Sequence, residues 1–299
     1  MTWSFFQKRW VKFLATLLIL GALFFTLDSS RFFAAIFQID PWWMTLGVAL
    51  SFLFVALRMF KWKLLANSNG LHASGPMLVR CMLFALALGI ITPGRIGEAV
   101  AIMPFAPPDR GKTIVAYVYD RIGELATVLL FCIPATLMFI PVWGGLLALA
   151  LAFGSVGMIF LMNSQRLRAW ITGRLPEAIS GRLAKISEAS IHAPLSYWLL
   201  SFVTYIVTYA SIAAFVAGAD SNMTFKALLV LPVVTLSNLV TITIGGLGVR
   251  EGLAALVSPA AGLLPEVTAA AFFLSFFWTR LLPGAVGAIW TMGAGYKFR

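Results

Sequence analysis

Long apolar runs separated by short polar segments dominate the chain. A helix needs about 20 apolar residues to cross the hydrocarbon core of a bilayer. The runs that meet this requirement are 11–27, 41–59, 113–138, 142–162, 195–217 and 266–292. The first run follows basic residues and is similar to a signal peptide, but no small-residue cleavage site comes after it, so we interpret it as a retained span. The pattern predicts an all-α polytopic membrane protein with about six transmembrane helices.

Two further apolar stretches, about 76–104 and 226–258, are long but interrupted. Residues 91–98 read Ile-Thr-Pro-Gly-Arg-Ile-Gly-Glu, and residues 243–251 read Thr-Ile-Gly-Gly-Leu-Gly-Val-Arg-Glu. Proline removes a backbone donor and glycine weakens a helix. A broken backbone at membrane depth needs protein or a water-filled cavity around it. Each stretch is therefore either a kinked full crossing or a re-entrant helical hairpin.

The positions of the basic residues favour two re-entrant hairpins. Lys and Arg are enriched in the cytoplasmic segments of membrane proteins. With a cytoplasmic N-terminus and both interrupted stretches re-entrant, nearly all basic residues between the spans are cytoplasmic, including Arg58 and Lys61 at the end of the 41–59 span. If only the first stretch crossed fully, the basic 163–193 loop would lie outside. We therefore expect a multi-pass protein with both termini in the cytoplasm.

Composition supports this class and excludes others. Of the 299 residues, 61% are hydrophobic and 11% are charged, whereas about 25% of a soluble domain is charged. The net charge of +11 does not indicate a nucleic-acid partner, because basic residues in so apolar a chain gather at the membrane surface. Two cysteines and two histidines offer no disulfide scaffold or metal cluster. Nucleotide-binding and hydrolase motifs are absent, so we expect no cofactor, no metal and no enzymatic activity.

Eight charged side chains fall inside the predicted membrane segments, where one charge costs about 2.5–3.5 kcal/mol or more. They are Arg95, Glu98, Asp120, Arg121, Glu124, Arg250, Glu251 and Arg280. On one interpretation the four arginines and four carboxylates only neutralise one another and hold the broken backbone together. On the other they form a binding site, with the carboxylates balancing charge or carrying protons.

Phosphate is the ligand that such a site would suit. A guanidinium presents a planar fork of donors that matches phosphate oxygens, so we predict that Arg95 and Arg250 bind an anionic headgroup. Arg121 and Arg280 brace the hairpins or complete the site. Broken helices also offer backbone N–H groups, and glycine lets a ligand approach them. The predicted backbone anion site consists of Gly94, Gly97, Gly245, Gly246 and Gly248.

The two interruptions occupy corresponding positions in the two halves of the chain. Each is followed by a span with an embedded arginine, Arg121 in the first half and Arg280 in the second. Paired interrupted segments are the sequence signature of the central site of an inverted-repeat transporter. We therefore interpret residues 1–299 as one integral membrane domain, with candidate repeat halves at about 41–138 and 195–292.

Four motifs together resemble one family. They are Pro93-Gly-Arg-Ile-Gly-Glu98, Asp120-Arg121, Gly245-Gly-Leu-Gly-Val-Arg-Glu251 and Thr279-Arg-Leu-Leu-Pro283. The chain is similar to the lysylphosphatidylglycerol synthase transmembrane-region family, the flippase-like membrane half of multiple peptide resistance factor proteins, as a stand-alone member. The resemblance implies a bacterial or archaeal inner membrane and the translocation of a phospholipid or a polyprenyl-phosphate-linked lipid.

The leading hypothesis is a lipid flippase or transporter that moves an anionic lipid without intrinsic ATPase activity. Two alternatives stay open. One is a non-transporting accessory membrane subunit of a partner glycosyltransferase or lipid-modifying enzyme, and the other is a transporter of a small soluble anion. In each case membrane lipids surround the protein, and no nucleic acid is expected to bind.

Overall fold

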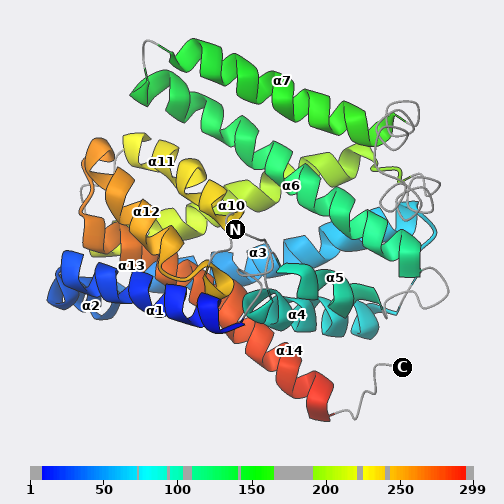
Figure 1. Ribbon diagram of the computed structural model, residues 1–299, viewed down its shortest axis with the longest axis horizontal. Helices are drawn as coiled ribbons and strands as arrows, with labels where there is room; N and C mark the ends of the chain where they lie inside the picture. Colours follow the sequence, from blue (N-terminus) through cyan, green and yellow to red (C-terminus); the bar gives the residue numbers. More distant parts are fainter. Residues whose placement is uncertain are drawn as a thin grey trace.

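The computed structural model describes residues 9–72, 74–92, 95–103, 110–140, 143–164, 191–220, 225–239 and 243–293, and these residues form helices and connecting turns. Gly94 and most of the basic 163–193 loop lie outside them. The longer helices are α1 (Arg9–Thr26), α2 (Ser29–Phe37), α3 (Pro41–Ser68), α4 (Gly75–Ile91), α5 (Ile96–Ile102), α6 (Arg110–Phe139), α7 (Gly144–Asn163), α10 (Leu195–Ala219), α11 (Phe225–Thr235), α12 (Val249–Val257), α13 (Pro265–Phe276) and α14 (Leu282–Gly293) (Figure 1).

The predicted spans correspond to helices of the structure. Four helical segments are long and apolar enough to cross a membrane: Pro41–Ser68, Gly111–Phe139, Leu195–Ala219 and Pro265–Gly293. The other two predicted runs form α1 and α7, of 18 and 20 residues. Large apolar side chains such as Phe25 and Phe153 are 91% and 73% exposed. Soluble monomers rarely expose large apolar surfaces. The structure thus confirms an all-α polytopic membrane protein.

Small residues allow the long helices to approach one another closely. Helix α3 packs against α10, and α14 packs against α4. Between α3 and α10, the Ser51 and Ser211 hydroxyls lie 2.8 Å apart, and Ser211 donates to the Gly47 carbonyl oxygen at 2.9 Å. Gly287 of α14 lies so close to Leu83 that a Cβ atom would come within 2.4 Å of its backbone. Close packing of this kind drives helix association in lipid, where apolar burial contributes little.

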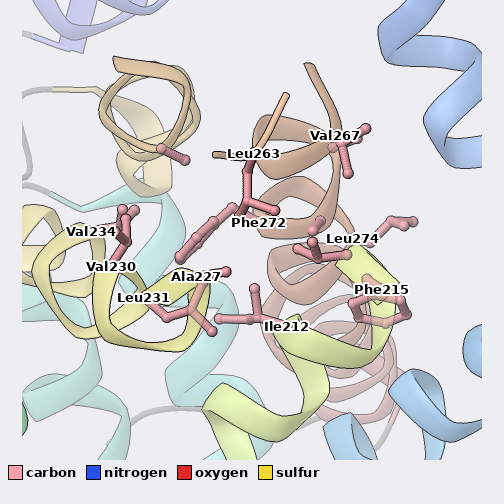
Figure 2. Packing of buried hydrophobic residues seen from close by; sticks show 14 of the residues in the cluster. Ile212, Phe215, Ala227, Val230, Leu231, Val234, Leu263, Val267, Phe272 and Leu274 are labelled. Carbon is pink, nitrogen blue, oxygen red and sulfur yellow. The ribbon is translucent and has the colours of Figure 1, made fainter. Parts of the chain in front are cut away.

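Two apolar cores hold the bundle together. The first joins α10, α11 and α13, with Ile212 and Phe272 almost completely buried (Figure 2). The second lies around Trp62 of α3 and Tyr197 of α10, and includes residues of α4, α5 and α6. The charged residues described below lie beside this second core, so their surroundings are apolar.

Both predicted interruptions are breaks in helical structure. Helix α4 ends at Ile91, and α5, which begins at Ile96, packs back against α4. Helix α11 is followed by the short turns η4 (Leu236–Leu239) and η5 (Ile244–Gly246), and then by α12. Turn η5 contacts α4, so the two interruptions meet in space. Their entry into the membrane from opposite sides stays a prediction.

Helix α3 differs from its predicted extent. It continues to Ser68 instead of ending near residue 59, and it carries Arg58 and Lys61, which are 6% and 0% exposed. The prediction ended the span between these two residues and assigned both to a cytoplasmic segment, whereas α3 continues through them and buries both side chains. Both side chains point from α3 toward α6, where carboxylates compensate their charge. Helix α2 was not predicted; the Asp28 carboxylate caps it by accepting from the Ser30 and Arg31 N–H groups.

Candidate functional site

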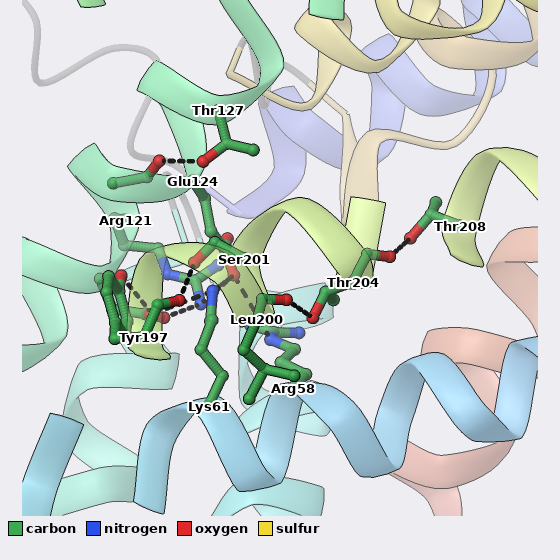
Figure 3. Close-up of polar contacts among 12 residues, drawn as sticks. Arg58, Lys61, Arg121, Glu124, Thr127, Tyr197, Leu200, Ser201, Thr204 and Thr208 are labelled. Atoms are coloured by element: carbon green, nitrogen blue, oxygen red, sulfur yellow. Dashed lines mark hydrogen bonds and ion pairs between the residues drawn. The ribbon is translucent and has the colours of Figure 1, made fainter. Parts of the chain in front are cut away.

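Seven charged side chains meet where α3, α5 and α6 come together. This charge cluster consists of Arg58, Lys61, Arg95, Glu98, Asp120, Arg121 and Glu124. Figure 3 shows Arg58 and Lys61 extending from α3 toward Arg121 and Glu124 of α6. Four cations and three carboxylates leave the cluster with one excess positive charge.

Glu98 has three arginines around it. Its Oε2 atom lies 3.0 Å from Arg58 Nη2 and 3.7 Å from Arg121 Nη1, and its Oε1 atom lies 3.6 Å from Arg95 Nε. The Tyr117 hydroxyl also donates to Oε2 at 3.1 Å. Because Glu98 is 2% exposed, these neighbours replace the water that an ionised carboxylate would otherwise require.

Lys61 joins the two carboxylates of α6. Its Nζ atom lies 3.0 Å from Asp120 Oδ1 and 2.9 Å from Glu124 Oε1. Arg121 binds the other oxygen of each carboxylate, at 2.8 Å and 2.6 Å. The Tyr197 hydroxyl donates to Asp120 Oδ1 at 3.0 Å. Asp120 and Glu124 are one helical turn apart, so one face of α6 presents both carboxylates to α3.

The break between α4 and α5 gives Glu98 its position. Arg95, which precedes α5, has a φ of 58°, in the left-handed region that side chains other than glycine rarely adopt. The Thr92 hydroxyl donates to the Leu88 carbonyl at 2.6 Å and accepts from the Gly97 N–H at 2.8 Å, which ties the two helices together. A Cβ atom at Gly89 would come within 2.5 Å of Glu98 Oε1, so glycine makes room for the carboxylate.

A cavity of about 460 Å³ opens beside the charge cluster. Its charged lining consists of Arg58, Arg95, Arg121, Glu124 and Arg280. Four arginines and one carboxylate thus line the cavity, whereas Glu98 and Asp120 are buried and do not belong to the lining. Apolar side chains line the remainder, together with hydroxyl groups of α10; the apolar ones include Phe54, Val118, Leu125, Val128 and Leu236. The cavity combines an electropositive end with an apolar wall.

Several arginines of the lining have donors without a partner, among them the buried Nε atoms of Arg58 and Arg121. Arg95 Nη2 is buried without a hydrogen-bond partner. Arg280 has no ion-pair or hydrogen-bond partner among the residues that the structure describes. It belongs to η7 (Phe277–Leu281), a π-helical turn, and single π turns inside helices frequently occur at functional sites. The cavity therefore holds donors that an anion could accept from.

The second interruption holds its charges differently. Arg250 and Glu251 pair with each other, and Glu251 Oε2 accepts from the Gly248 N–H at 2.7 Å. The Arg250 guanidinium lies 4.8 Å from the centre of the Phe276 ring. Neither Arg250 nor Glu251 lines the cavity. Glu251 caps the start of α12, and the pair neutralises itself.

Helix α1 covers this second interruption. The Ile244 N–H donates to the Thr16 hydroxyl of α1 at 2.9 Å. The backbone at Gly245, Gly246 and Gly248 has positive φ, and a Cβ atom at Gly248 would come within 2.7 Å of Ile19. Here glycine allows a tight turn beneath α1.

The predicted backbone anion site has fewer free donors than expected. The Gly97 N–H donates to Thr92, the Gly248 N–H to Glu251, and the Gly246 N–H to the Thr243 carbonyl oxygen at 3.4 Å. These three N–H groups already have acceptors within the chain. Gly94 lies outside the described residues.

The structure thus brings together most of the predicted site, but not all of it. Arg95, Glu98, Asp120, Arg121 and Glu124 form one cluster, and Arg280 lines the adjoining cavity. Arg250 and Glu251 do not join them at the cavity.

Sequence reasoning missed Arg58 and Lys61, although the sequence carries a signal for them. Their positions continue the buried stripe of α3 from Ser51 and Val55 to Leu65, at the spacing of three to four residues that marks one helix face. A charged residue on this buried face of α3 is expected to lie in the protein interior.

Fold and site together define a polytopic helical membrane protein with a cationic cavity among its helices. The Lysylphosphatidylglycerol synthase TM region family matches residues 10–287. The chain therefore belongs to this family, as the four sequence motifs indicated. No curated protein and no solved structure matches the chain.

Proposed function

We propose that the protein is a lipid flippase or transporter that moves an anionic lipid across the bacterial or archaeal inner membrane without intrinsic ATPase activity. The cavity carries this proposal, because four arginines and one glutamate share it with apolar side chains. A phosphate headgroup is matched by guanidinium donors, and apolar walls accommodate the adjoining chains. A small soluble anion would gain nothing from the apolar part of the lining.

Within this proposal, Arg95 and Arg280 are the headgroup ligands, since both line the cavity, Arg95 Nη2 has no partner, and Arg280 has none among the described residues. Arg58 and Arg121 are shared with the carboxylates and supply positive field. Glu124 is the carboxylate that faces the cavity, so it is the residue to exchange a proton or an ion-pair partner as the lipid enters. Arg250 and Glu251 hold the second interruption in shape.

The topology belongs to the same proposal. The helix breaks between α4 and α5 and between α11 and α12 act as the two re-entrant hairpins, and both termini lie in the cytoplasm. The cavity then lies where the two hairpins approach each other, between the halves of the chain. Membrane lipids are the partners that this arrangement requires.

Reconstitution in liposomes tests the proposal. Purified protein is inserted into phosphatidylcholine vesicles with a trace of fluorescent phosphatidylglycerol, and dithionite destroys the fluorescence of the outer leaflet. We expect the wild-type protein to expose inner-leaflet phosphatidylglycerol as well, and Arg280→Gln to do so at least tenfold more slowly. Lys226→Gln is the matched control, because Lys226 is exposed on α11 and does not line the cavity.

Two other results would replace the proposal. Flux of chloride or phosphate without lipid movement would make the protein a small-anion transporter. Neither activity, with the protein folded and inserted, would favour an accessory subunit of a lipid- or glycan-modifying enzyme.

A further inference from the structure

The charges of the described residues around the cavity do not balance. The charge cluster contains four cations and three carboxylates, which leaves one positive charge. Arg280 lines the same cavity and adds a second positive charge, with no partner among the described residues. Charges removed from water normally have compensating partners. An occupant with two negative charges would make the whole site neutral.

We infer, on the basis of the proposed lipid-transport function, that the substrate headgroup carries two negative phosphate charges, as in a lipid phosphomonoester or a lipid diphosphate esterified at both ends. A phosphodiester such as phosphatidylglycerol carries one negative charge and would leave one arginine uncompensated. A phosphomonoester carries close to two above its second pKa of about 6. Arg280 supplies the charge that distinguishes the two classes.

The donors agree with the charge count. Arg95 Nη2 has no partner, and the Arg280 guanidinium is unpaired among the described residues. A terminal phosphate has more unsubstituted oxygens than a phosphodiester, so it can accept from both arginines at once. Arg58 and Arg121 also have a buried Nε atom without a hydrogen-bond partner, but carboxylates hold their Nη2 atoms at 3.0 Å and 2.8 Å.

The apolar part of the lining identifies the source of this phosphate as a lipid. Phe54 and Leu236 share the cavity with Arg280. Free phosphate has the same charge but makes no use of apolar contacts. Binding of inorganic phosphate therefore distinguishes a site for free phosphate from a site for a lipid headgroup.

Binding of two lipids that differ by one methyl ester on the phosphate, and so by one headgroup charge, tests the inference. The purified full-length protein is titrated at pH 8 with dioctanoyl phosphatidic acid, a phosphomonoester, and with dioctanoyl phosphatidylmethanol, its phosphodiester counterpart. We expect phosphatidic acid to bind at least tenfold more tightly, because its second negative charge and extra unsubstituted oxygen allow one more charge-assisted hydrogen bond to an arginine. At pH 5, where phosphatidic acid carries one charge, that preference should shrink to about twofold.

A variant attributes the preference to Arg280. Arg280→Gln should bind both lipids about equally at pH 8, whereas the control Lys226→Gln should keep the wild-type preference. Thermal unfolding of both variants shows whether they are folded. Equal affinities of the wild-type protein for the two lipids, or an unchanged preference in folded Arg280→Gln, would overturn the inference. Inorganic phosphate that binds as tightly as phosphatidic acid would overturn the lipid source.

The transport assay separates this inference from the proposed function. Movement of phosphatidylglycerol without any preference for phosphatidic acid would refute the doubly charged headgroup and leave lipid transport standing. Tight binding of phosphatidic acid without movement of any lipid would leave the headgroup assignment standing and refute transport.

Discussion

Glu98 and Glu251 occupy the same position, the third residue of a helix that restarts after a break, yet the two side chains make different contacts. Glu251 accepts from the Gly248 N–H, which precedes its helix, and pairs with its neighbour Arg250. Glu98 instead faces Arg58, Arg95 and Arg121. A glutamate at this position normally caps its helix. Only at the second break does the glutamate cap its helix.

The surroundings explain this difference. The second break is covered by α1, and the Arg250–Glu251 pair is neutral in charge without an outside group. The first break opens on a cavity lined by more arginines than carboxylates. We therefore propose separate tasks for two interruptions with similar sequences: the second stabilises the backbone, and the first prepares a site for an anion.

The largest expected effect is a loss of stability in Glu98→Gln. The substitution leaves three arginines without a central carboxylate, and breaking a buried ion pair costs about 3–5 kcal/mol. We expect a marked fall in the thermal unfolding temperature of the protein in a fixed detergent. The unfolding temperature of Glu251→Gln should fall less, because only one arginine loses a partner and the amide oxygen still accepts from the Gly248 N–H. Equal falls for the two variants would remove the contrast between the breaks.

Gly89→Ala tests whether the first break shapes its own charge cluster. The new methyl group would come within 2.5 Å of Glu98 Oε1, so the carboxylate must move away from its arginines. Overpacking of this kind costs about 1–3 kcal/mol. Gly145→Ala is the matched control in α7, where a Cβ atom meets nothing within 4 Å. The unfolding temperature should fall in Gly89→Ala and not in the control.

Arginine-to-lysine exchange compares the two breaks in transport. Lysine keeps the charge but loses the planar fork of donors. Arg95→Lys should reduce lipid movement by about tenfold, because a headgroup ligand is affected. Arg250→Lys should keep it within about twofold, since a lysine still pairs with Glu251. A reversed order would make the second break the site, and fully active Arg95→Lys would leave the arginines with charge neutralisation alone.

The smallest effect is expected at the hydroxyl groups of the cavity. The Thr208 hydroxyl donates to the Thr204 carbonyl oxygen within α10 at 2.9 Å, so it is not a free donor. Thr208→Val, which keeps the side-chain shape, should change lipid affinity by less than about threefold. A larger loss in the binding titration would show that hydroxyl groups, and not arginines, recognise the headgroup.

Much of the fold could be predicted because the membrane restricts the possibilities. Apolar runs of sufficient length had to be helices. The helix breaks occur in the two stretches where the sequence has Pro93 and the glycines around residue 245. The charges at Glu98, Asp120 and Glu124 were conspicuous because they interrupt apolar sequence. Their partners were not predicted, since pairing between α3 and α6 depends on tertiary packing.

The errors share one physical cause. Hydropathy ends a span near its first charges, so the predicted 41–59 span stopped between Arg58 and Lys61, although α3 continues to Ser68 and buries both. Similar motifs at Arg95 and Arg250 suggested one shared site, whereas the neighbours of each arginine determine its role. Neighbours from distant helices are the information that a single sequence lacks.

Mass spectrometry of lipids retained by the purified protein tests the central claim most directly, because it asks which break binds the lipid. Wild-type protein, Arg95→Gln with Arg280→Gln, and Arg250→Gln would be compared after identical purification. We predict that an anionic lipid is retained by the wild-type protein and by Arg250→Gln, and is lost from the double variant. Retention by the double variant together with loss from Arg250→Gln would contradict the account.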